Sequence, residues 1–193
     1  MIRIANDTDA PAMLAIYAPY VENTTVSFEY EAPSREEFLR RFQAITAQFP
    51  WLVWEEEGRV LGYAYAAAPF ERAAFRWCAE PSIYLLPEAR GRGIGGKLYA
   101  ALEKILEHQG YQVLYALITE ENIPSVRFHQ KHGYRACMTL PGCGYKRGRW
   151  LGLVWMEKRL NFVGNPSTFP DSWLSIVQDA ERFTNILDSL SLS

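Results

Sequence analysis

The chain has 193 residues, of which 49% are hydrophobic and 22% charged, and its formal net charge is −2. This length and composition suit a single α/β domain with a substantial core, and the near-neutral charge argues against a nucleic-acid-binding surface. No apolar run approaches the roughly 20 residues that a membrane span needs, and Met1 to Asp7 lacks the apolar segment of a secretory signal, so we expect a cytoplasmic protein that binds neither membrane nor nucleic acid.

The start of the chain predicts a strand and two helices. Ile2 to Ala5 is a short apolar run typical of a strand, and a helical pattern begins near Pro11, with Asp7 or Thr8 as its capping residue. The second helix opens at Ser34, where Ser-Arg-Glu-Glu matches a capping box.

Strands and helices then alternate, as in an α/β domain. In order they are a hairpin of Trp51–Trp54 and Val60–Ala66, a strand from Ser82, a helix from Ile94 to His108, a strand from Val113 to Ile118, a helix after Asn122, and an antiparallel pair whose second member is Leu151–Lys158. We expect one domain over residues 1–160.

Residues 161–193 form a tail of different character. Asn165 to Pro170 is rich in residues that break regular structure, and apolar residues then recur at helical spacing. They are Trp173, Ile176, Val177, Ala180, Phe183, Leu187 and Leu190. The pattern predicts an amphipathic helix that packs either on its own domain or across a dimer.

A glycine-rich loop joins the strand from Ser82 to the helix at Ile94. It reads Arg90-Gly91-Arg92-Gly93-Ile94-Gly95-Gly96-Lys97. Glycines let backbone N–H groups approach an anion closely, the following helix adds its positive N-terminal end, and the two arginines can neutralise charge. The loop therefore predicts a phosphate-binding site.

Three phosphate-binding patterns overlap on this loop. Its glycines match the dinucleotide pattern G-x-G-x-x-G, with Glu120 near the usual distance of an acidic ribose ligand. The P-loop pattern G-x-x-x-x-G-K begins at Gly91, but Leu98 stands where a P-loop needs Ser or Thr for magnesium. The third pattern, R-x-x-G-x-G, begins at Arg90 and lies between a strand and a helix.

The third pattern resembles the pyrophosphate loop of the GCN5-related N-acetyltransferase (GNAT) superfamily, whose members bind acetyl-CoA. A second motif of that superfamily follows one strand later: an Asn at a strand end, a small residue three positions on, an aromatic residue or His seven on, and a Gly-aromatic pair. Here these residues are Asn122, Ser125, His129, Gly133 and Tyr134. Dinucleotide enzymes have no reason to carry this second motif.

This resemblance covers about Ile2 to Leu160. It implies the α/β (α+β) fold of the acyl-CoA N-acyltransferases, in which helices flank a central mixed, mostly antiparallel sheet. Within the superfamily the chain resembles the phosphinothricin and L-amino acid N-acetyltransferases. The segments that carry this likeness are Asn23–Phe28, Pro50–Val53, Gly62–Ala66, Trp77–Glu80 with Tyr84, Gly110–Tyr111 and Gly148–Trp150.

Relatives of this kind acetylate the α-amino group of small amino acids or of analogues such as phosphinothricin and methionine sulfoximine. The resemblance therefore implies acetyl-CoA as cosubstrate and a small-molecule amine as acceptor, and we expect a homodimer. An acetyltransferase for another small amine, a nucleotide-dependent oxidoreductase and an inactive acyl-CoA sensor are the alternatives.

The resemblance also implies roles for individual residues. Glu80 is the expected general base, and His129, where much of the superfamily has tyrosine, is expected to donate or shuttle a proton to the thiolate leaving group. Phe28 and Tyr84 should line the acceptor pocket, and Arg72 should face the anionic end of the acceptor. The expected cofactor contacts are the backbone of Ile83, Tyr84 and Leu85, the loop residues Arg90, Gly91, Arg92, Gly93, Ile94, Gly95 and Gly96, and Asn122 and Ser125.

Two departures from the relatives bear on the acceptor. Phe70 and Phe75 stand where phosphinothricin enzymes carry further polar groups beside Arg72, and Gly152 stands where relatives commonly place an aspartate. Fewer groups would therefore bind a phosphinate, and we expect a broader small L-amino acid acceptor.

The cysteines and the expected chemistry do not call for a metal. Cys78, Cys137 and Cys143 are odd in number and lack metal-binding spacing, so we expect reduced thiols.

Overall fold

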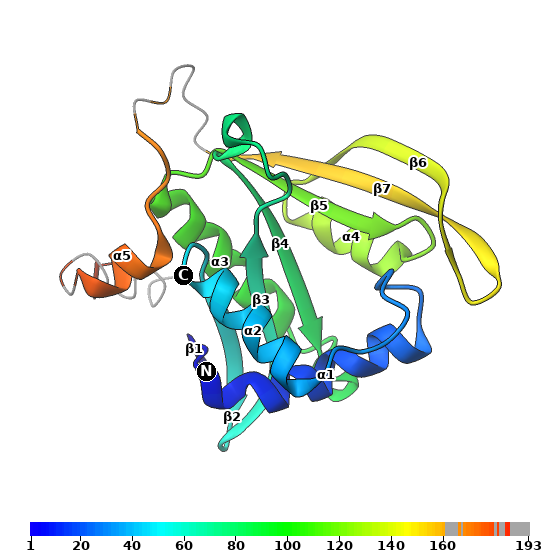
Figure 1. The fold of residues 1–193 in the computed structure, drawn as a ribbon, viewed down its shortest axis with the longest axis horizontal. Coiled ribbons are helices and arrows are strands. Elements are labelled where there is room, and N and C mark those ends of the chain that lie inside the picture. Colours follow the sequence, from blue (N-terminus) through cyan, green and yellow to red (C-terminus); the bar gives the residue numbers. More distant parts are fainter. Residues whose placement is uncertain (161–165, 167, 180, 182–183, 186–193) are drawn as a thin grey trace.

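A seven-stranded sheet with the order β1-β2-β3-β4-β5-β7-β6 runs through the centre of the computed structural model, which describes residues 1–160, 166, 168–179, 181 and 184–185 (Figure 1). Its strands are β1 (Ile2–Ile4), β2 (Trp51–Glu56), β3 (Arg59–Ala67), β4 (Cys78–Leu85), β5 (Val113–Thr119), β6 (Arg135–Lys146) and β7 (Arg149–Arg159). All neighbouring strands are antiparallel except β4 and β5. The mixed, mostly antiparallel sheet expected from the sequence is confirmed.

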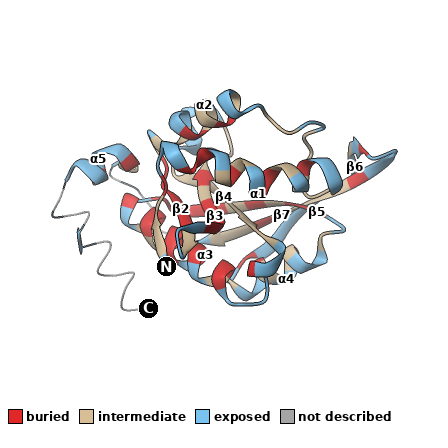
Figure 2. Cartoon of the chain, turned by 90° about the horizontal axis from the view of Figure 1, so that it is seen from below, coloured by how far each residue is buried: buried red, intermediate tan, exposed pale blue. Residues whose placement is uncertain are grey.

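Helices cover both faces of the sheet (Figure 2). The helices α1 (Ala10–Asn23) and α2 (Arg35–Thr46) lie on one face, and α3 (Ile94–Gln109) and α4 (Ile123–Lys131) lie on the other. Each face has its own core, with Leu98 and Leu102 of α3 fully buried on one side and Tyr63 of β3 buried on the other. Burial of each such side chain contributes about 1.5–3 kcal/mol, so both layers stabilise the sheet.

The first helix starts differently from the sequence expectation. Asn6, rather than Asp7 or Thr8, is the capping residue: its side chain accepts from the Thr8 N–H at 2.9 Å, and the Asp9 carboxylate accepts from the Asn6 N–H at 2.9 Å. This box caps a short 3₁₀ turn, Asp7–Asp9, that leads into α1. The sequence motif was missed because the box precedes the helical apolar pattern by a full turn.

The second helix forms half of its expected capping box. The Ser34 hydroxyl accepts from the Glu37 N–H at 3.1 Å, as predicted. The Glu37 carboxylate, however, binds Arg40 and Arg41 one turn further along the helix. Two charged partners at helical spacing therefore hold Glu37 on the outer face of α2.

The central strands β4 and β5 diverge soon after they begin. They pair only at Cys78–Val113 and Ala79–Leu114, so one edge of β4 is unpaired with β5 from Glu80 onward. β4 begins four residues before the predicted start at Ser82. The strand tolerates Pro81, which cannot donate a ladder hydrogen bond, because this edge is free.

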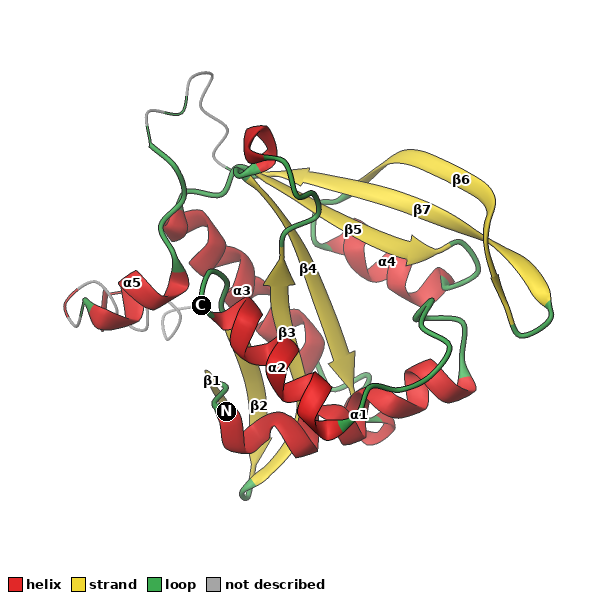
Figure 3. Ribbon diagram, viewed as in Figure 1, coloured by secondary structure: helices red, strands yellow, loops and turns green. Residues whose placement is uncertain are grey.

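The hairpin of β6 and β7 reaches out beyond the helices (Figure 3). Nearly all side chains of β6 are exposed, and this strand forms the end of the sheet. The hairpin is therefore bound to the domain chiefly through the pairing of β7 with β5.

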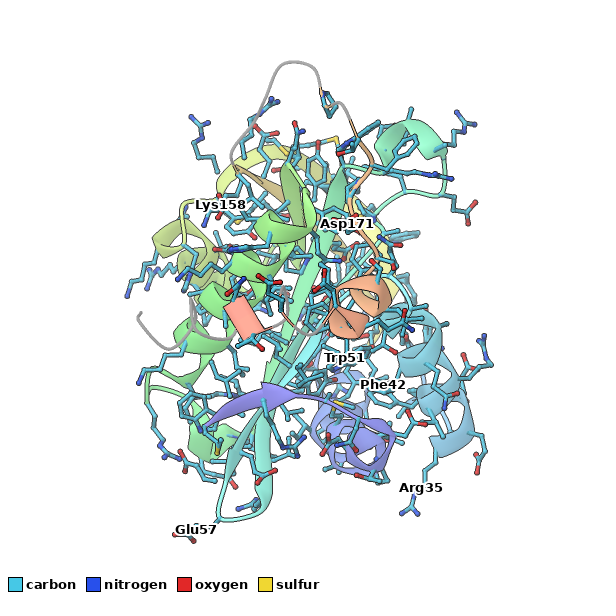
Figure 4. All side chains as sticks on the ribbon, turned by 90° about the vertical axis from the view of Figure 1, so that its left-hand side faces the viewer. Arg35, Phe42, Trp51, Glu57, Lys158 and Asp171 are labelled. Atoms are coloured by element: carbon cyan, nitrogen blue, oxygen red, sulfur yellow. The ribbon has the colours of Figure 1, made fainter. Side chains whose placement is uncertain are left out.

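The described part of the C-terminal tail packs on its own domain. Trp173 and Ile176 of α5 (Trp173–Gln178) are 4% and 0% exposed. Before them, Asp171, labelled in Figure 4, donates its N–H to the Gln109 carbonyl at 2.8 Å, and the Trp173 N–H donates to the Gln48 carbonyl at 2.9 Å. The predicted positions Ala180, Phe183, Leu187 and Leu190 lie outside the described residues.

Candidate active site

A small pocket of about 70 Å³ lies where β4 and β5 diverge. It brings together several residues that the sequence singled out separately. They are Glu80, Ile83 and Tyr84 of β4, Asn122 before α4, and Ser125 and His129 of α4. Val26, from the loop after α1, and Thr119, at the end of β5, also line the pocket, as do neighbouring residues of β4 and β5.

The two faces of β4 present different groups to this pocket. Side chains alternate along a strand, and Ile83 and Leu85 pack into the core on the α3 side. Tyr84 points the opposite way, where its ring lies 4.9 Å from that of Tyr17. Glu80, four residues before Tyr84, lies on the same face as Tyr84.

Glu80 is a partly buried carboxyl group, and it lies inside β4 rather than just before the strand. Burial raises its pKa from 4.5 to about 7, because the surrounding protein disfavours the charged form. A group that exchanges its proton near neutral pH suits a general base. Glu80 therefore lies in the cleft and has a pKa that suits it to accept a proton from an amine.

His129 is buried, and both of its ring nitrogens have partners. The Ser125 carbonyl, 2.8 Å from Nδ1, can only accept, so Nδ1 carries the hydrogen and Nε2 accepts from the Tyr99 hydroxyl at 2.8 Å. Burial lowers the pKa of His129 to about 4. The imidazole is thus neutral at pH 7, which limits it to hydrogen bonding or proton relay and disfavours donation from an imidazolium.

The loop before α3 has the backbone shape expected of a phosphate site. Gly91 and Gly93 have φ angles of +73° and +79°, and a Cβ built on either would meet open space. Gly93 precedes the first turn of α3, whose leading N–H groups have no intrahelical acceptor. These features leave a side-chain-free surface at the positive end of a long helix.

The two arginines of this loop contact neighbouring side chains. Arg90 donates to the Tyr20 hydroxyl at 2.9 Å, and Arg92 binds the Glu56 carboxylate at 2.8 Å. Both are exposed, so screening by solvent keeps these contacts weak. A multiply charged anion at the loop can therefore compete with them.

Gly95 and Asn122 have structural tasks that the motifs did not reveal. A Cβ on Gly95 would lie 3.2 Å from Leu85 Cδ1, so this glycine lets α3 pack closely on β4. The Asn122 side chain accepts from the Ser125 N–H at 3.3 Å and caps α4. Both residues shape the site by fixing helices, in addition to any contact with a ligand.

Tyr20 contributes to the site but was not predicted to do so. Its hydroxyl donates to the Leu85 carbonyl at 2.5 Å, and the Leu85 N–H donates back at 3.3 Å. These are backbone groups of β4 close to where it has separated from β5. The two partners are 65 positions apart in the sequence, so no local signal indicates this contact.

The expected acceptor residues do not all reach the pocket. Tyr84 lines it, whereas Phe28 lies against β6, where a Cβ on Gly144 would come within 2.8 Å of the ring. Arg72 is exposed and lines a separate hollow of about 430 Å³, together with Phe70 and Phe75.

The space above Gly152 holds another carboxylate. A Cβ on Gly152 would lie 2.2 Å from Glu120 Oε2, and the Glu120 N–H donates to the Gly152 carbonyl at 2.9 Å. The absence of an aspartate at this position therefore does not remove negative charge from this part of the sheet. The carboxylate comes instead from the end of β5.

Two features are absent from the described part of the chain. No cluster of three His, Cys, Asp or Glu side chains in that part of the chain could hold a metal ion. None of the helices described is both long enough and apolar enough to cross a membrane.

Comparison with known proteins places this geometry in context. The model of the acetyltransferase (GNAT) domain family matches residues 2–155. The chain is 38% identical over 165 residues to a phosphinothricin N-acetyltransferase of Streptomyces viridochromogenes, which covers 86% of this chain and 90% of the relative. It is 36% identical to an L-methionine sulfoximine/L-methionine sulfone acetyltransferase of Pseudomonas paraeruginosa, with 83% and 94% covered.

A solved structure agrees with these relatives. A GNAT superfamily phosphinothricin acetyltransferase from Sinorhizobium meliloti, in complex with AcCoA, is similar to this chain with a TM-score of 0.81 and 35% identity. The match covers 89% of this chain and 92% of that structure.

Proposed function

The chain belongs to the GNAT acetyltransferase family, and we propose that this acetyl-CoA-dependent N-acyltransferase modifies the amino group of a small L-amino acid or amino-acid analogue. The observation that carries the proposal is Glu80, a partly buried carboxyl group with a pKa of about 7 in the cleft where β4 and β5 diverge. The relatives act on compounds of this class, and their likeness extends over most of the chain.

Two parts of the site suit acetyl-CoA: the glycine-rich loop before α3 and the free edge of β4. The open backbone at Gly91 and Gly93 and the unpaired first-turn N–H groups of α3 would hold the pyrophosphate. The free edge of β4 near Ile83 would hold the extended arm of acetyl-CoA that carries the thioester. Acetyl-CoA, when bound, supplies an activated acetyl group as a thioester.

Glu80 then has a defined task in the reaction. An amino acid is an ammonium ion at neutral pH, and its nitrogen cannot attack a carbonyl carbon until it loses a proton. The Glu80 carboxylate accepts that proton, and its partly buried position keeps its basicity high enough to do so. Ser125 would hydrogen-bond the leaving group, while His129 holds Ser125 in place through its bond to the Ser125 carbonyl.

We propose that the acceptor's side chain lies toward Phe70 and Phe75, in the hollow that is separate from the Glu80 pocket, and that it is more apolar than phosphinothricin. The ring centroid of Phe70 lies 4.5 Å from that of Phe75 and 5.7 Å from that of Trp155, on which it stacks. Aromatic rings therefore occupy the positions beside Arg72. An apolar surface favours methionine-like side chains over a phosphinate, which would lose hydration without full compensation. Methionine and methionine sulfoximine are the acceptors proposed first.

We also propose a cytoplasmic homodimer. The β6–β7 hairpin exposes Met138, Tyr145 and Trp150, the last with 68% of its surface accessible. A long exposed edge strand with large apolar side chains is normally covered. A second copy of the hairpin would cover it, and light scattering during gel filtration would measure the assembly.

An acceptor screen tests the proposed function. Release of free thiol from acetyl-CoA is measured with methionine, methionine sulfoximine, phosphinothricin, an aminoglycoside and a polyamine. The proposal predicts turnover with the amino acids, and faster turnover with the first two than with phosphinothricin. Turnover with only the aminoglycoside or polyamine would overturn the amino-acid acceptor while leaving the acyltransferase activity intact.

A further inference from the structure

Lys146, at the end of β6, is buried although it carries a charged side chain. Only 4% of its surface is accessible, and its ammonium group donates to the carbonyl oxygens of Val21 and Ser27, each at 2.7 Å. Buried ammonium groups need such partners because leaving water is costly. These two bonds span 125 and 119 residues of sequence.

The two carbonyl groups belong to α1 and to the loop that follows it. Val21 lies in the last turn of α1, whose terminal carbonyls lack helical partners and which carries no basic residue of its own in that turn. Ser27 lies in residues 24–28, here called the 24–28 loop. Lys146 therefore ties the end of α1 and this loop to the tip of the β6–β7 hairpin.

Other contacts hold the same loop against the pocket. The Thr119 hydroxyl, at the end of β5, donates to the Thr25 carbonyl at 2.6 Å, and the Tyr17 and Ser27 hydroxyl groups are 2.9 Å apart. Val26, between these fixed points, lines the pocket that contains Glu80. The position of Val26 thus depends on bonds made on both sides of it.

We propose that Lys146 is a positioning residue for the acceptor, which it affects by fixing the 24–28 loop as a wall of the Glu80 pocket. The proposal rests on the proposed amino-acid acetylation. The cofactor side of the site is built from β4, α3 and α4, whereas these two Lys146 bonds go to α1 and to the 24–28 loop. Loss of Lys146 should therefore disturb acceptor binding and leave cofactor binding intact.

Steady-state kinetics of three variants test this inference. Lys146→Met keeps the length of the side chain and removes the ammonium group; we expect the acceptor KM to rise by about tenfold or more, since misplacement of about 1 Å at a reacting site can cost a hundredfold. The KM for acetyl-CoA should stay within about twofold of wild type. Arg147→Gln, which removes a bond to the Glu22 carbonyl outside the loop, is the matched control and should change neither KM.

Gly144→Ala provides a second perturbation that retains the charge. Its Cβ would lie 2.8 Å from the Phe28 ring, so the ring or the backbone of the 24–28 loop has to move, although the Lys146 ammonium group is retained. The same selective rise in acceptor KM is expected. This variant decides the question if Lys146→Met does not fold.

Hydrogen exchange separates this inference from the proposed function. Backbone exchange in the 24–28 loop should increase in Lys146→Met, while exchange in α3 remains unchanged. Folded variants with unchanged loop exchange and unchanged acceptor KM would overturn the inference, as would an equal rise in both KM values. If no amino acid is acetylated by the wild type, increased loop exchange would retain the loop-fixing role and remove only the acceptor from the proposal.

Discussion

Replacement of Glu80 by Gln removes the proposed base with little change in shape. The pKa of about 7, against an ordinary value of 4.5, means that burial favours the protonated form by about 3 kcal/mol. About half of the molecules therefore carry the carboxylate at pH 7, and kcat/KM for the acceptor should rise roughly tenfold between pH 6 and pH 8.

In Glu80→Gln this rise near pH 7 should disappear, and kcat at pH 7 should fall by the roughly 10²- to 10⁴-fold that loss of a general base causes. The deficit should shrink at high pH, where more of the amine is already free. Initial-rate measurements over pH 5.5–9.5 would check this, with Glu57→Gln, an exposed residue of the turn between β2 and β3, as control. A near-normal kcat with the wild-type profile would refute the role of Glu80.

The same substitution has a consequence for stability that does not depend on catalysis. Because the pKa of Glu80 is raised in the folded state, the folded protein loses stability as pH rises from about 4.5 through about 7, where this partly buried carboxyl must ionise. Gln has no such cost. Thermal unfolding should therefore show Glu80→Gln gaining in Tm relative to wild type between about pH 5 and pH 8.

The other predictions concern separate parts of the molecule. Gly93→Val places a β-branched residue at φ +79° in the phosphate loop, so calorimetry should show acetyl-CoA binding at least about tenfold weaker. Arg72→Ala should raise the acceptor KM and leave that of acetyl-CoA nearly unchanged; equal effects on both would contradict its assignment to the acceptor. His129→Asn should not remove an inflection near pH 6.5 from the pH–rate profile, because the pKa of the imidazole in the wild type is already about 4. Trp173→Ala should lower the free energy of unfolding by about 3–5 kcal/mol in denaturant titrations, since this side chain is 4% exposed.

Local sequence patterns were sufficient for most elements of the fold. Apolar periodicity located α3 within one residue at its C-terminal end, and the glycine-rich loop before it was placed between a strand and a helix, as observed. These features depend on neighbours within a few turns of chain. A single sequence displays such neighbours directly.

Contacts between distant segments could not be predicted in this way. Nothing near Lys146 indicates that its partners are Val21 and Ser27, and nothing near Tyr20 indicates Leu85. Gly95 illustrates a related limit, because its motif suggested a phosphate contact and gave no sign of the close packing against Leu85 that the structure shows. Both kinds of information arise only when the sheet brings separate segments together.

The most direct test of the function is to identify the product of one reaction. The enzyme is incubated with isotopically labelled acetyl-CoA and methionine sulfoximine or methionine, and the products are separated and analysed by mass spectrometry. We predict labelled N-acetyl amino acid and free CoA in equal amounts. Free CoA with labelled acetate but no acetylated amino acid, or no consumption of acetyl-CoA, would contradict the account.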